Sequence, residues 1–302
     1  MKYTKENLAV VIPSNNKKNV IKCIDAIKKQ TKSPGQTIVV FDKKIKFKNK
    51  KNFIFSYTNI SNQVHQRNYA LKFLNKKIKL ILQLDDKFCL NKNAIENLIF
   101  EWNNAKPDIA GIGLKSNSFQ YREYELNFLK YITLTGSSIP GKVLISGFNT
   151  KLVSQNNLKD VDWLQGGLSS WRLKHVQNIF DRKFPIIKWS IFEDLIFSFN
   201  IKKNKKFRLI MSNIVKAYTI NKKNKKFTPN DYLYRGFEYG RMHKVFVYIN
   251  SNSLSKIAFF YSYISSSILG ILWCIISLDS KLLFYLGRFK GIFANIKKIK
   301  VL

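Results

Sequence analysis

Short apolar runs alternate with stretches of helical spacing over roughly the first third of the chain. The apolar runs, which predict buried strands, are Leu8–Ile12, Thr37–Phe41, Phe53–Tyr57, Lys79–Leu84 and Ile109–Leu114. Apolar residues recur every three or four positions, as on one face of a helix, in Asn19–Gln30, Gln63–Leu74 and Ala94–Trp102. Because strands alternate with helices, we expect an α/β fold with a doubly wound, mostly parallel central sheet flanked by helices.

The run Lys79–Leu84 ends abruptly at two adjacent carboxylates, Asp85 and Asp86. Open α/β sheets bind their ligands at the carboxyl ends of their strands, so both residues are candidates for a binding site. The alternative is an ordinary strand-to-loop turn, in which Asp is common. No Gly-x-Gly-x-x-Gly follows the first strand, so a nucleotide would have to bind without a glycine-rich loop.

A different pattern appears near the C-terminus, where Ile257–Leu278 carries no charge. Its length is about the twenty residues that cross a bilayer, but three consecutive serines make it only moderately hydrophobic. It is therefore compatible with a membrane span, a re-entrant element, amphipathic helices in the membrane interface or a buried core helix. Basic residues flank it on both sides, so the positive-inside rule gives no orientation.

The net charge adds a second constraint. The chain has 53 Lys and Arg against 18 Asp and Glu, which gives +35. Such a charge attracts nucleic acid, an anionic membrane surface or phosphorylated substrates, unless many of the lysines are simply solvated surface. The sequence argues against nucleic acid as a partner, because no helix-turn-helix, aromatic RNP pattern or zinc module is recognisable. The three cysteines form no CxxC pair, which argues against a disulfide framework and a zinc site.

Three short segments share carboxylates or glycines and occur in a characteristic order. They are the Asp85-Asp86 turn, the Gly166-Gly167 loop and the Glu193-Asp194 pair that opens an expected helix. Together they resemble the inverting family 2 glycosyltransferases, which have the Rossmann-like GT-A fold, over roughly Leu8 to Lys244. The resemblance implies transfer of one sugar from a nucleotide-diphosphate sugar to a hydroxyl acceptor.

The resemblance also implies roles in donor binding. Asp85 and Asp86 match the first two positions of the family's Asp-x-Asp turn, which holds Mn²⁺ or Mg²⁺ on the donor diphosphate. Lys87 stands at the third position, where it cannot ligate a metal but can offset diphosphate charge. Asp86 is therefore the better candidate for the direct metal ligand. The remaining donor-binding residues that the resemblance implies are Pro13, Asp42 (for the base or ribose), Arg67, Gly166 and Gly167.

For the chemical step, the resemblance implies that Asp194 is the catalytic base and Glu193 its catalytic neighbour. A base must take the proton of the acceptor hydroxyl as this attacks the anomeric carbon. The alternative is that the two acidic residues only favour the start of a helix. The Gln-x-x-Arg-Trp motif of processive synthases is absent from the sequence, which favours a single transfer. Arg235 and Arg241 are further candidate cations for the diphosphate.

We therefore expect a GT-A domain over residues 2–248 and hydrophobic, basic, membrane-associating helices over residues 254–302. This arrangement would bring the nucleotide-sugar donor to a glycan or lipid-linked acceptor at the cytoplasmic face of an anionic membrane, as in the synthesis of cell-envelope polysaccharides. Two other functions remain open. They are a basic nucleic-acid-binding protein and, because of Lys87, an inactive carbohydrate-binding relative of the transferases.

Overall fold

The described part of the chain divides into two compact units. A computed structural model describes residues 2–47, 52–116, 128–152, 160–176, 191–205, 207–220, 227–250 and 252–295. The first unit contains the described residues up to 116 and those between 160 and 220. The second contains residues 128–152 and the described residues from 227 onward. The predicted domain boundary between residues 248 and 254 stays a prediction.

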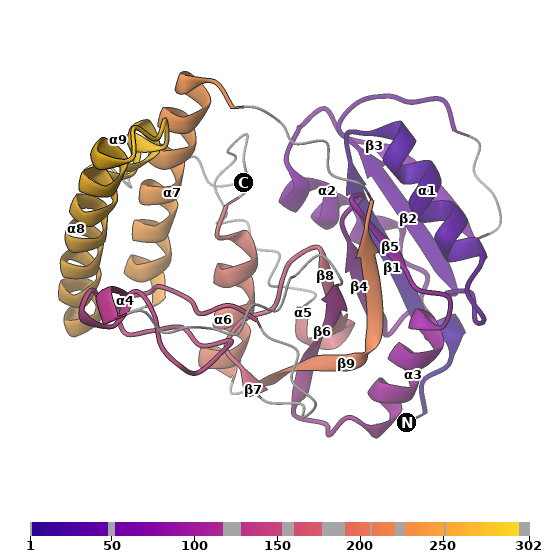
Figure 1. The fold of residues 1–302 in the computed structure, drawn as a ribbon. Helices are drawn as coiled ribbons and strands as arrows, with labels where there is room; N and C mark the ends of the chain where they lie inside the picture. Colours follow the sequence, from indigo (N-terminus) through magenta and orange to yellow (C-terminus); the bar gives the residue numbers. More distant parts are fainter. Residues whose placement is uncertain are drawn as a thin grey trace. The chain divides into compact units, whose positions relative to one another are not determined.

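The first unit is built on one mixed β-sheet (Figure 1). Its strands are β1 (Leu8–Ser14), β2 (Gln36–Phe41), β3 (Phe53–Tyr57), β4 (Leu80–Leu84), β5 (Phe88–Leu90), β6 (Ile109–Ser116), β7 (Asp160–Val161), β8 (Leu168–Arg172) and β9 (Arg208–Thr219). The strand order is β3-β2-β1-β4-β8-β6-β9-β5, and β7 pairs with β9. The predicted α/β class, with helices flanking a central sheet, is confirmed.

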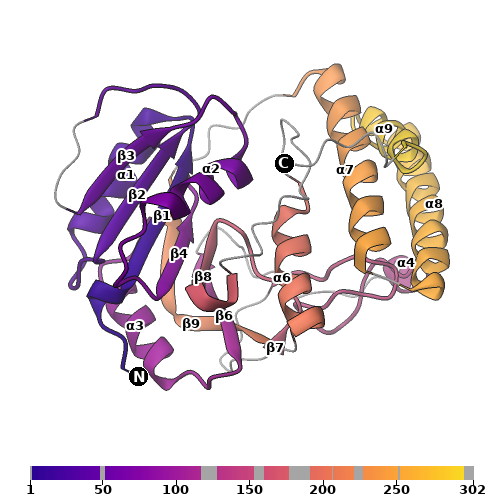
Figure 2. The same ribbon diagram turned by 180° about the vertical axis from the view of Figure 1, so that it is seen from behind.

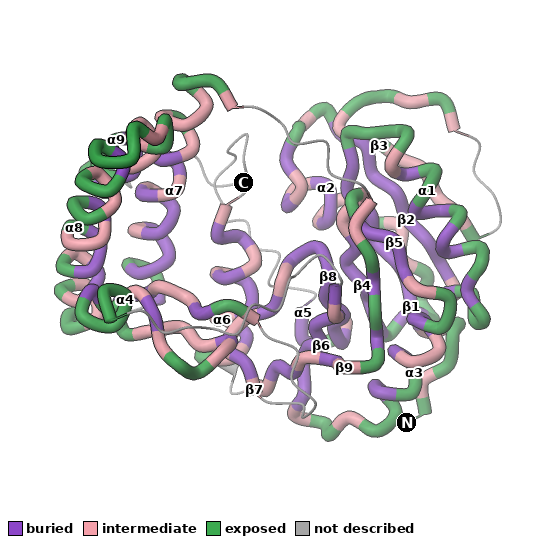
Figure 3. The backbone as a smooth tube through the Cα atoms, in the orientation of Figure 1, coloured by how far each residue is buried: buried purple, intermediate pink, exposed green. Residues whose placement is uncertain are grey.

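The half of the sheet formed by β3, β2, β1 and β4 is wholly parallel, as predicted. Parallel neighbours need crossover connections, and here these include α1 (Lys17–Lys28) and α2 (Gln63–Ala70), which lie on opposite faces of the sheet (Figure 2). Every residue of β1, β2 and β4 is buried, as expected for strands covered on both faces (Figure 3). The Asn16 and Asn62 side chains cap the two helices by accepting hydrogen bonds from backbone N–H groups of their first turns.

The other half of the sheet mixes directions. Strand β8 is antiparallel to β4 and β6, whereas β6 and β9 are parallel. Strand β6 was predicted, whereas β5, β7, β8 and β9 have no counterpart in the sequence-based prediction. The remaining helices of the first unit are η1 (Lys5–Asn7), η2 (Leu71–Phe73), α3 (Ala94–Asn104), α5 (Leu173–Val176) and α6 (Glu193–Lys205).

The second unit is helical. Its helices are α4 (Phe128–Ile132), α7 (Pro229–Asn250), α8 (Ser253–Ile276) and α9 (Leu282–Ile292). Within the described residues, α8 is the one helix that is long and apolar enough to cross a membrane. It corresponds to the predicted hydrophobic C-terminal segment. Only 28% of its most apolar window is buried, which distinguishes it from the core helix of a soluble domain.

Candidate active site

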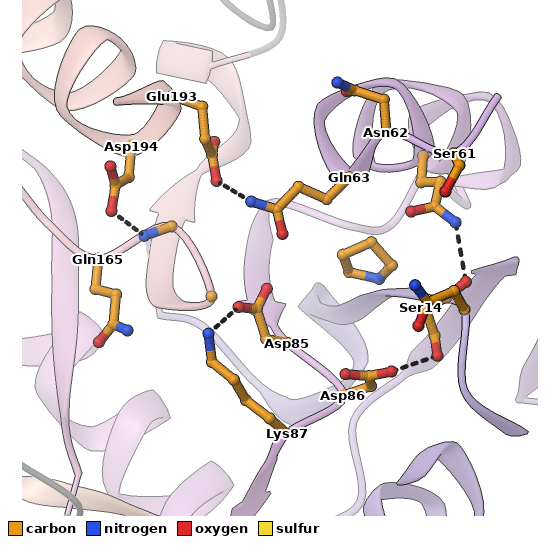
Figure 4. A pocket seen from close by; sticks show the side chains of 15 residues that line it. Ser14, Ser61, Asn62, Gln63, Asp85, Asp86, Lys87, Gln165, Glu193 and Asp194 are labelled. Atoms are coloured by element: carbon orange, nitrogen blue, oxygen red, sulfur yellow. Dashed lines mark hydrogen bonds and ion pairs between the residues drawn. The ribbon is translucent and has the colours of Figure 1, made fainter. Parts of the chain in front are cut away.

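A cavity of about 410 Å³ opens at the carboxyl ends of β1 and β4, where the predicted site residues converge (Figure 4). Its wall is formed by the segments after these strands, the N-terminus of α2, the loop before β8 and the N-terminus of α6. All of these segments belong to the first unit. The predicted site residues that line it are Pro13, Asp85, Asp86, Lys87, Gly166, Gly167, Glu193 and Asp194.

Arg67 is absent from the lining of the cavity and instead contacts two of the carboxylates in its wall. Its Nη2 donates to Asp85 Oδ1 at 2.8 Å, and its Nη1 donates to Glu193 Oε1 at 2.6 Å. The Arg67 side chain is only 1% exposed, and a buried charge of this kind is tolerated when it is paired. The Arg67 guanidinium therefore holds the two carboxylates in place, and its predicted contact with a donor stays a prediction.

The two partners of Arg67 differ in pKa. Burial alone would raise the pKa of Asp85, but the nearby charges of Arg67 and Lys87 outweigh it and lower the pKa below its usual value. Burial raises the pKa of Glu193 to about 7, and Arg67 opposes this only in part. The pKa values differ because Asp85 contacts two cations, Arg67 and Lys87, whereas Glu193 contacts only Arg67, which also pairs with Asp85.

Lys87 engages the second oxygen of Asp85. Its Nζ lies 3.0 Å from Asp85 Oδ2, and its side chain is 49% exposed. Both carboxylate oxygens of Asp85 therefore already contact a cation. Asp86 differs: Ser14 Oγ donates to its Oδ2 at 2.5 Å, and burial raises its pKa. Of the two predicted metal ligands, Asp86 is the one with an oxygen that is not engaged by a cation.

The charges of the wall bear on the predicted divalent metal. The described residues contain no cluster of three or more His, Cys, Asp or Glu side chains that would form a metal cage by themselves. The cavity is nevertheless lined by four carboxylates, which Lys87 in the lining and Arg67 behind it do not balance when all are ionised. Mg²⁺ at nucleotide sites is commonly held by one or two carboxylates together with substrate phosphates. The carboxylates of the wall are therefore suited to a divalent metal that is held by Asp86 together with a diphosphate.

The two glycines of the wall are explained by close approach to the carboxylates. A Cβ at Gly167 would lie 2.1 Å from Asp85 Cγ, and a Cβ at Gly166 would lie 2.7 Å from Glu193 Oε1. Neither glycine has a positive φ, so a left-handed turn is not the reason for either. Any side chain here would displace the carboxylates that line the cavity.

Asp194 lies at the start of α6 and faces the cavity (Figure 4). Its oxygens accept from the backbone N–H of Leu195 at 2.9 Å and of Gly166 at 3.4 Å. Burial raises its pKa despite these hydrogen bonds, which makes the carboxylate more basic than an exposed one. The preceding Phe192 has φ 62°, a strained value for a residue with a side chain. Such strain is typical of functional sites, and here it immediately precedes the two acidic residues.

Several polar residues of the wall were missed by the sequence-based prediction. Gln63 Nε2 donates to Glu193 Oε1 at 3.0 Å, and Gln66 Nε2 donates to the carbonyl of Ser14 at 3.0 Å. Both belong to α2, whose N-terminal turn follows the capping residue Asn62. A polar N-terminal turn after a parallel strand is the signal that would have indicated them.

Asp42 lies outside the lining of the cavity but contacts it indirectly. Ser61, which lines the cavity, donates from its Oγ to Asp42 Oδ2 at 3.1 Å. Asp42 Oδ1 is buried and has no hydrogen-bond partner among the described residues. The predicted contact of Asp42 with a base or ribose stays a prediction.

Arg235 and Arg241 belong to α7 in the second unit. The Arg241 guanidinium is paired with Glu238, with Nη2 and Oε2 at 2.5 Å. The Arg235 guanidinium stacks over the Phe227 ring at 4.0 Å. Their predicted contact with a diphosphate stays a prediction.

Comparisons with known proteins identify the fold. No protein-family model and no curated protein matches the sequence. Among solved structures, S. aureus TarS residues 1–349 in complex with UDP-GlcNAc has a TM-score of 0.56 at 17% identity, covering 94% of this chain and 79% of that one. The mannosyltransferase PcManGT from Pyrobaculum calidifontis, in complex with GDP-Man and Mn²⁺, has a TM-score of 0.54 at 11% identity, with coverages of 95% and 87%. The UDP complex of TarS 1–349 has a TM-score of 0.52 at 15% identity, with coverages of 95% and 88%. The similarity confirms the GT-A fold that the resemblance implied.

Proposed function

We propose that the protein is an inverting glycosyltransferase that moves one sugar from a nucleotide-diphosphate sugar to a hydroxyl group. The observation that carries the proposal is the convergence of Asp86 and Asp194 on one cavity at the carboxyl ends of the strands (Figure 4). The similarity to proteins solved with GDP-Man and UDP-GlcNAc supports the class of donor.

In the proposed reaction, Asp194 takes the proton from the acceptor hydroxyl. The hydroxyl oxygen forms a bond to the anomeric carbon, while the bond from that carbon to the diphosphate oxygen breaks on the opposite face. The electron pair of that bond leaves with the diphosphate. Glu193, held by Arg67 and Gln63, positions the start of α6 and hence Asp194. Lys87 offsets part of the charge on the leaving diphosphate.

A divalent metal, Mn²⁺ or Mg²⁺, would be held by Asp86 together with the diphosphate. When bound, it would neutralise charge on the diphosphate. Two findings support this part of the proposal: the excess of carboxylates in the wall and the Mn²⁺ in the PcManGT complex. We place Asp85 beside the metal as an orienting residue, because Arg67 and Lys87 already occupy its oxygens.

The acceptor is proposed to be a glycan or lipid-linked molecule at the cytoplasmic face of a membrane. The support is the exposed, apolar helix α8 together with the net charge of +35. Such a location would serve the synthesis of a cell-envelope polysaccharide.

The test is donor binding by the purified protein, followed as thermal stabilisation with UDP, GDP and their sugars, each with and without Mn²⁺. A ligand that binds only the folded state raises the melting temperature. We expect one nucleotide to raise the melting temperature, and Mn²⁺ to increase this stabilisation further. Asp86→Asn should abolish the additional stabilisation by Mn²⁺, whereas Asp194→Asn should leave it unchanged. Asp25→Asn, an exposed carboxylate on α1, is the matched control and should change nothing.

Two other results would each select a different function. Absence of stabilisation by every nucleotide, with tight and salt-sensitive binding to DNA or RNA, would refute the proposal in favour of nucleic-acid binding. Nucleotide-sugar binding without turnover of any acceptor would favour an inactive carbohydrate-binding relative. The Lys87–Asp85 ion pair is the observation that favours this last alternative.

A further inference from the structure

Exposed apolar side chains are concentrated in the second unit. Among the described residues, all but five of the large apolar side chains that are exposed belong to this unit. The exceptions are Ile21, Tyr57, Phe100, Ile214 and Tyr218. Monomeric soluble proteins rarely expose contiguous apolar patches unless they bind a partner or a membrane.

One face of α8 carries a continuous apolar stripe. Its residues are spaced three or four positions apart, so they share one side of the helix. The α8 stripe consists of Leu254, Ile257, Tyr261, Ile264, Ile268, Leu272 and Ile275. Figure 3 shows the exposed outer face of this helix in green.

The buried face of α8 mixes serines with aromatic residues, whereas the stripe contains no serine. Ser262 and Ser267 are fully buried, and Phe259 and Tyr263 lie between and beside them. A water-exposed amphipathic helix has the reverse arrangement, with its apolar face inward. The pattern therefore indicates that the surroundings of the stripe are apolar.

Helix α4 extends the apolar surface. Tyr261 Oη donates to the carbonyl of Ile132 at 2.9 Å, which attaches α4 to α8. Phe128 and Tyr131 on α4 are also exposed. At the other end of α8, Trp273 is exposed. Aromatic side chains of this kind are enriched where a membrane meets water.

The helices behind α8 argue against a membrane span. Helices α7 and α9 pack against each other through glycines: a Cβ at Gly236 would lie 2.0 Å from the carbonyl oxygen of Phe284, and one at Gly291 would lie 2.2 Å from that of Phe237. Since α8 packs on both helices, a spanning α8 would take α7 with it. That helix carries the Glu238–Arg241 ion pair and Lys244, and charged groups at the bilayer centre are costly.

The charge near the stripe favours an anionic surface. Lys130 and Lys290 are exposed on the helices of this unit, and Lys281, which is also exposed, pairs with Asp279. The Lys256 ammonium lies 5.0 Å from the centre of the Tyr248 ring, next to the start of the stripe. Basic residues beside an apolar face attract anionic headgroups. A second copy of this strongly basic chain would instead be repelled.

We propose that the α8 stripe and α4 form a binding surface for an anionic lipid bilayer, in which α8 lies in the plane of the membrane and does not cross it. This inference deepens the proposed membrane location. It does not depend on sugar transfer, and its test has no step that requires activity.

Binding is tested by flotation of the full-length protein with sealed vesicles of phosphatidylcholine, with and without one-third phosphatidylglycerol. The test variant is the triple substitution Ile257→Gln, Ile264→Gln and Ile268→Gln. We expect it to lower the partition coefficient on anionic vesicles by about a hundredfold, since each change removes an apolar side chain from lipid. The matched control is the triple substitution Ile21→Gln, Phe100→Gln and Ile214→Gln on the first unit, which should leave binding within about threefold.

The orientation is tested after expression in bacterial cells, on membrane vesicles with the cytoplasmic face outward. Asn252→Cys and Ser280→Cys place an exposed thiol near either end of α8, whereas the three native cysteines are buried. If α8 lies in the plane, a membrane-impermeant maleimide labels both positions without detergent. Protection of one position until detergent is added would show a span and overturn the proposal. Saturable self-association without vesicle binding would overturn it as well.

Discussion

Replacement of Arg67 by methionine is expected to destabilise the first unit in a pH-dependent way. The guanidinium is 1% exposed and pairs with Asp85 at 2.8 Å and Glu193 at 2.6 Å. Removing one partner of a buried ion pair typically costs about 3–5 kcal/mol, because the remaining charge is left buried without compensation. This is a large part of the roughly 5–15 kcal/mol that stabilises a typical domain. A unit of this size should lose roughly 6–20 °C in melting temperature.

The pH dependence follows from the two carboxyl groups. Burial raises both pKa values and Arg67 lowers them, so without Arg67 burial would hold the pKa of Glu193 further above that of the unfolded chain, and the pKa of Asp85 would rise because Lys87 alone would oppose burial. A carboxyl group whose pKa is higher in the folded than in the unfolded chain makes its full contribution to the free energy of unfolding when it is protonated. This contribution is lost as the pH rises through the folded-state pKa. The difference in unfolding free energy between wild type and Arg67→Met should therefore be smaller at pH 5 than at pH 8.

The assay is urea unfolding of both proteins at pH 5 and pH 8, with Arg172→Met as the matched control. Arg172 is also buried, but its guanidinium donates to the backbone carbonyls of residues 105–107 and pairs with no carboxylate that the structure describes. Its loss should cost the same at both pH values. Adding Glu193→Gln to Arg67→Met should recover part of the stability at pH 8. An equal cost of Arg67→Met at both pH values would refute the reasoning.

Three further predictions concern the cavity. Gly167→Ala should weaken donor binding at least tenfold in a thermal titration, because its Cβ would lie 2.1 Å from Asp85 Cγ; unchanged affinity would contradict the packing argument. Lys87→Met should weaken nucleotide diphosphate binding more in EDTA than in saturating Mn²⁺, as measured by calorimetry, because the metal replaces the missing charge; equal losses would contradict its role as a counter-charge. Asp194→Asn should lower kcat by roughly 10²–10⁴-fold with unchanged donor affinity. In the wild type, the pKa of Asp194 is raised, so activity should fall on acidification at a higher pH than it would with an exposed Asp as the base. Activity that stays constant down to pH 4 would exclude Asp194 as the base.

The parallel half of the sheet could be predicted from the sequence because its strands are mostly apolar. In the other half, β6 was predicted for the same reason, whereas β8 and β9 were hidden by two different patterns. In β8, Ser169 and Ser170 are fully buried, and their hydroxyls accept hydrogen bonds from the indole N–H groups of Trp171 and Trp102. In β9, buried and exposed positions alternate irregularly. A polar residue in a strand is recognised as buried only when its distant partner is known.

The sequence indicated those site residues that are neighbours in the chain. It did not indicate those that act through contacts with residues far away in the chain. The acidic pairs stand side by side in the sequence, at the end of a strand and at the start of a helix. The Arg67 ion pairs join residues 18 and 126 positions apart, and no local pattern indicates them. The structure shows Arg67 behind the carboxylates and the two glycines against Asp85 and Glu193. The donor-binding roles that the resemblance implies for these three residues stay predictions.

The net charge of +35 does not distinguish binding of a phosphorylated substrate from binding of an anionic membrane, but the distribution of charge does. The basic residues outnumber the acidic ones by 53 to 18, yet the cavity is lined by Asp85, Asp86, Glu193 and Asp194 against Lys87 alone. A bare polyanion would be repelled from such a cavity, whereas a diphosphate that arrives with a divalent cation would not. The excess of lysine therefore lies outside the cavity, and the apolar face of α8 with the lysines beside it is the surface for which we propose an anionic, apolar partner. If this is correct, Mn²⁺ should enhance nucleotide binding and leave vesicle binding unchanged, while salt should weaken vesicle binding far more strongly than it weakens nucleotide binding.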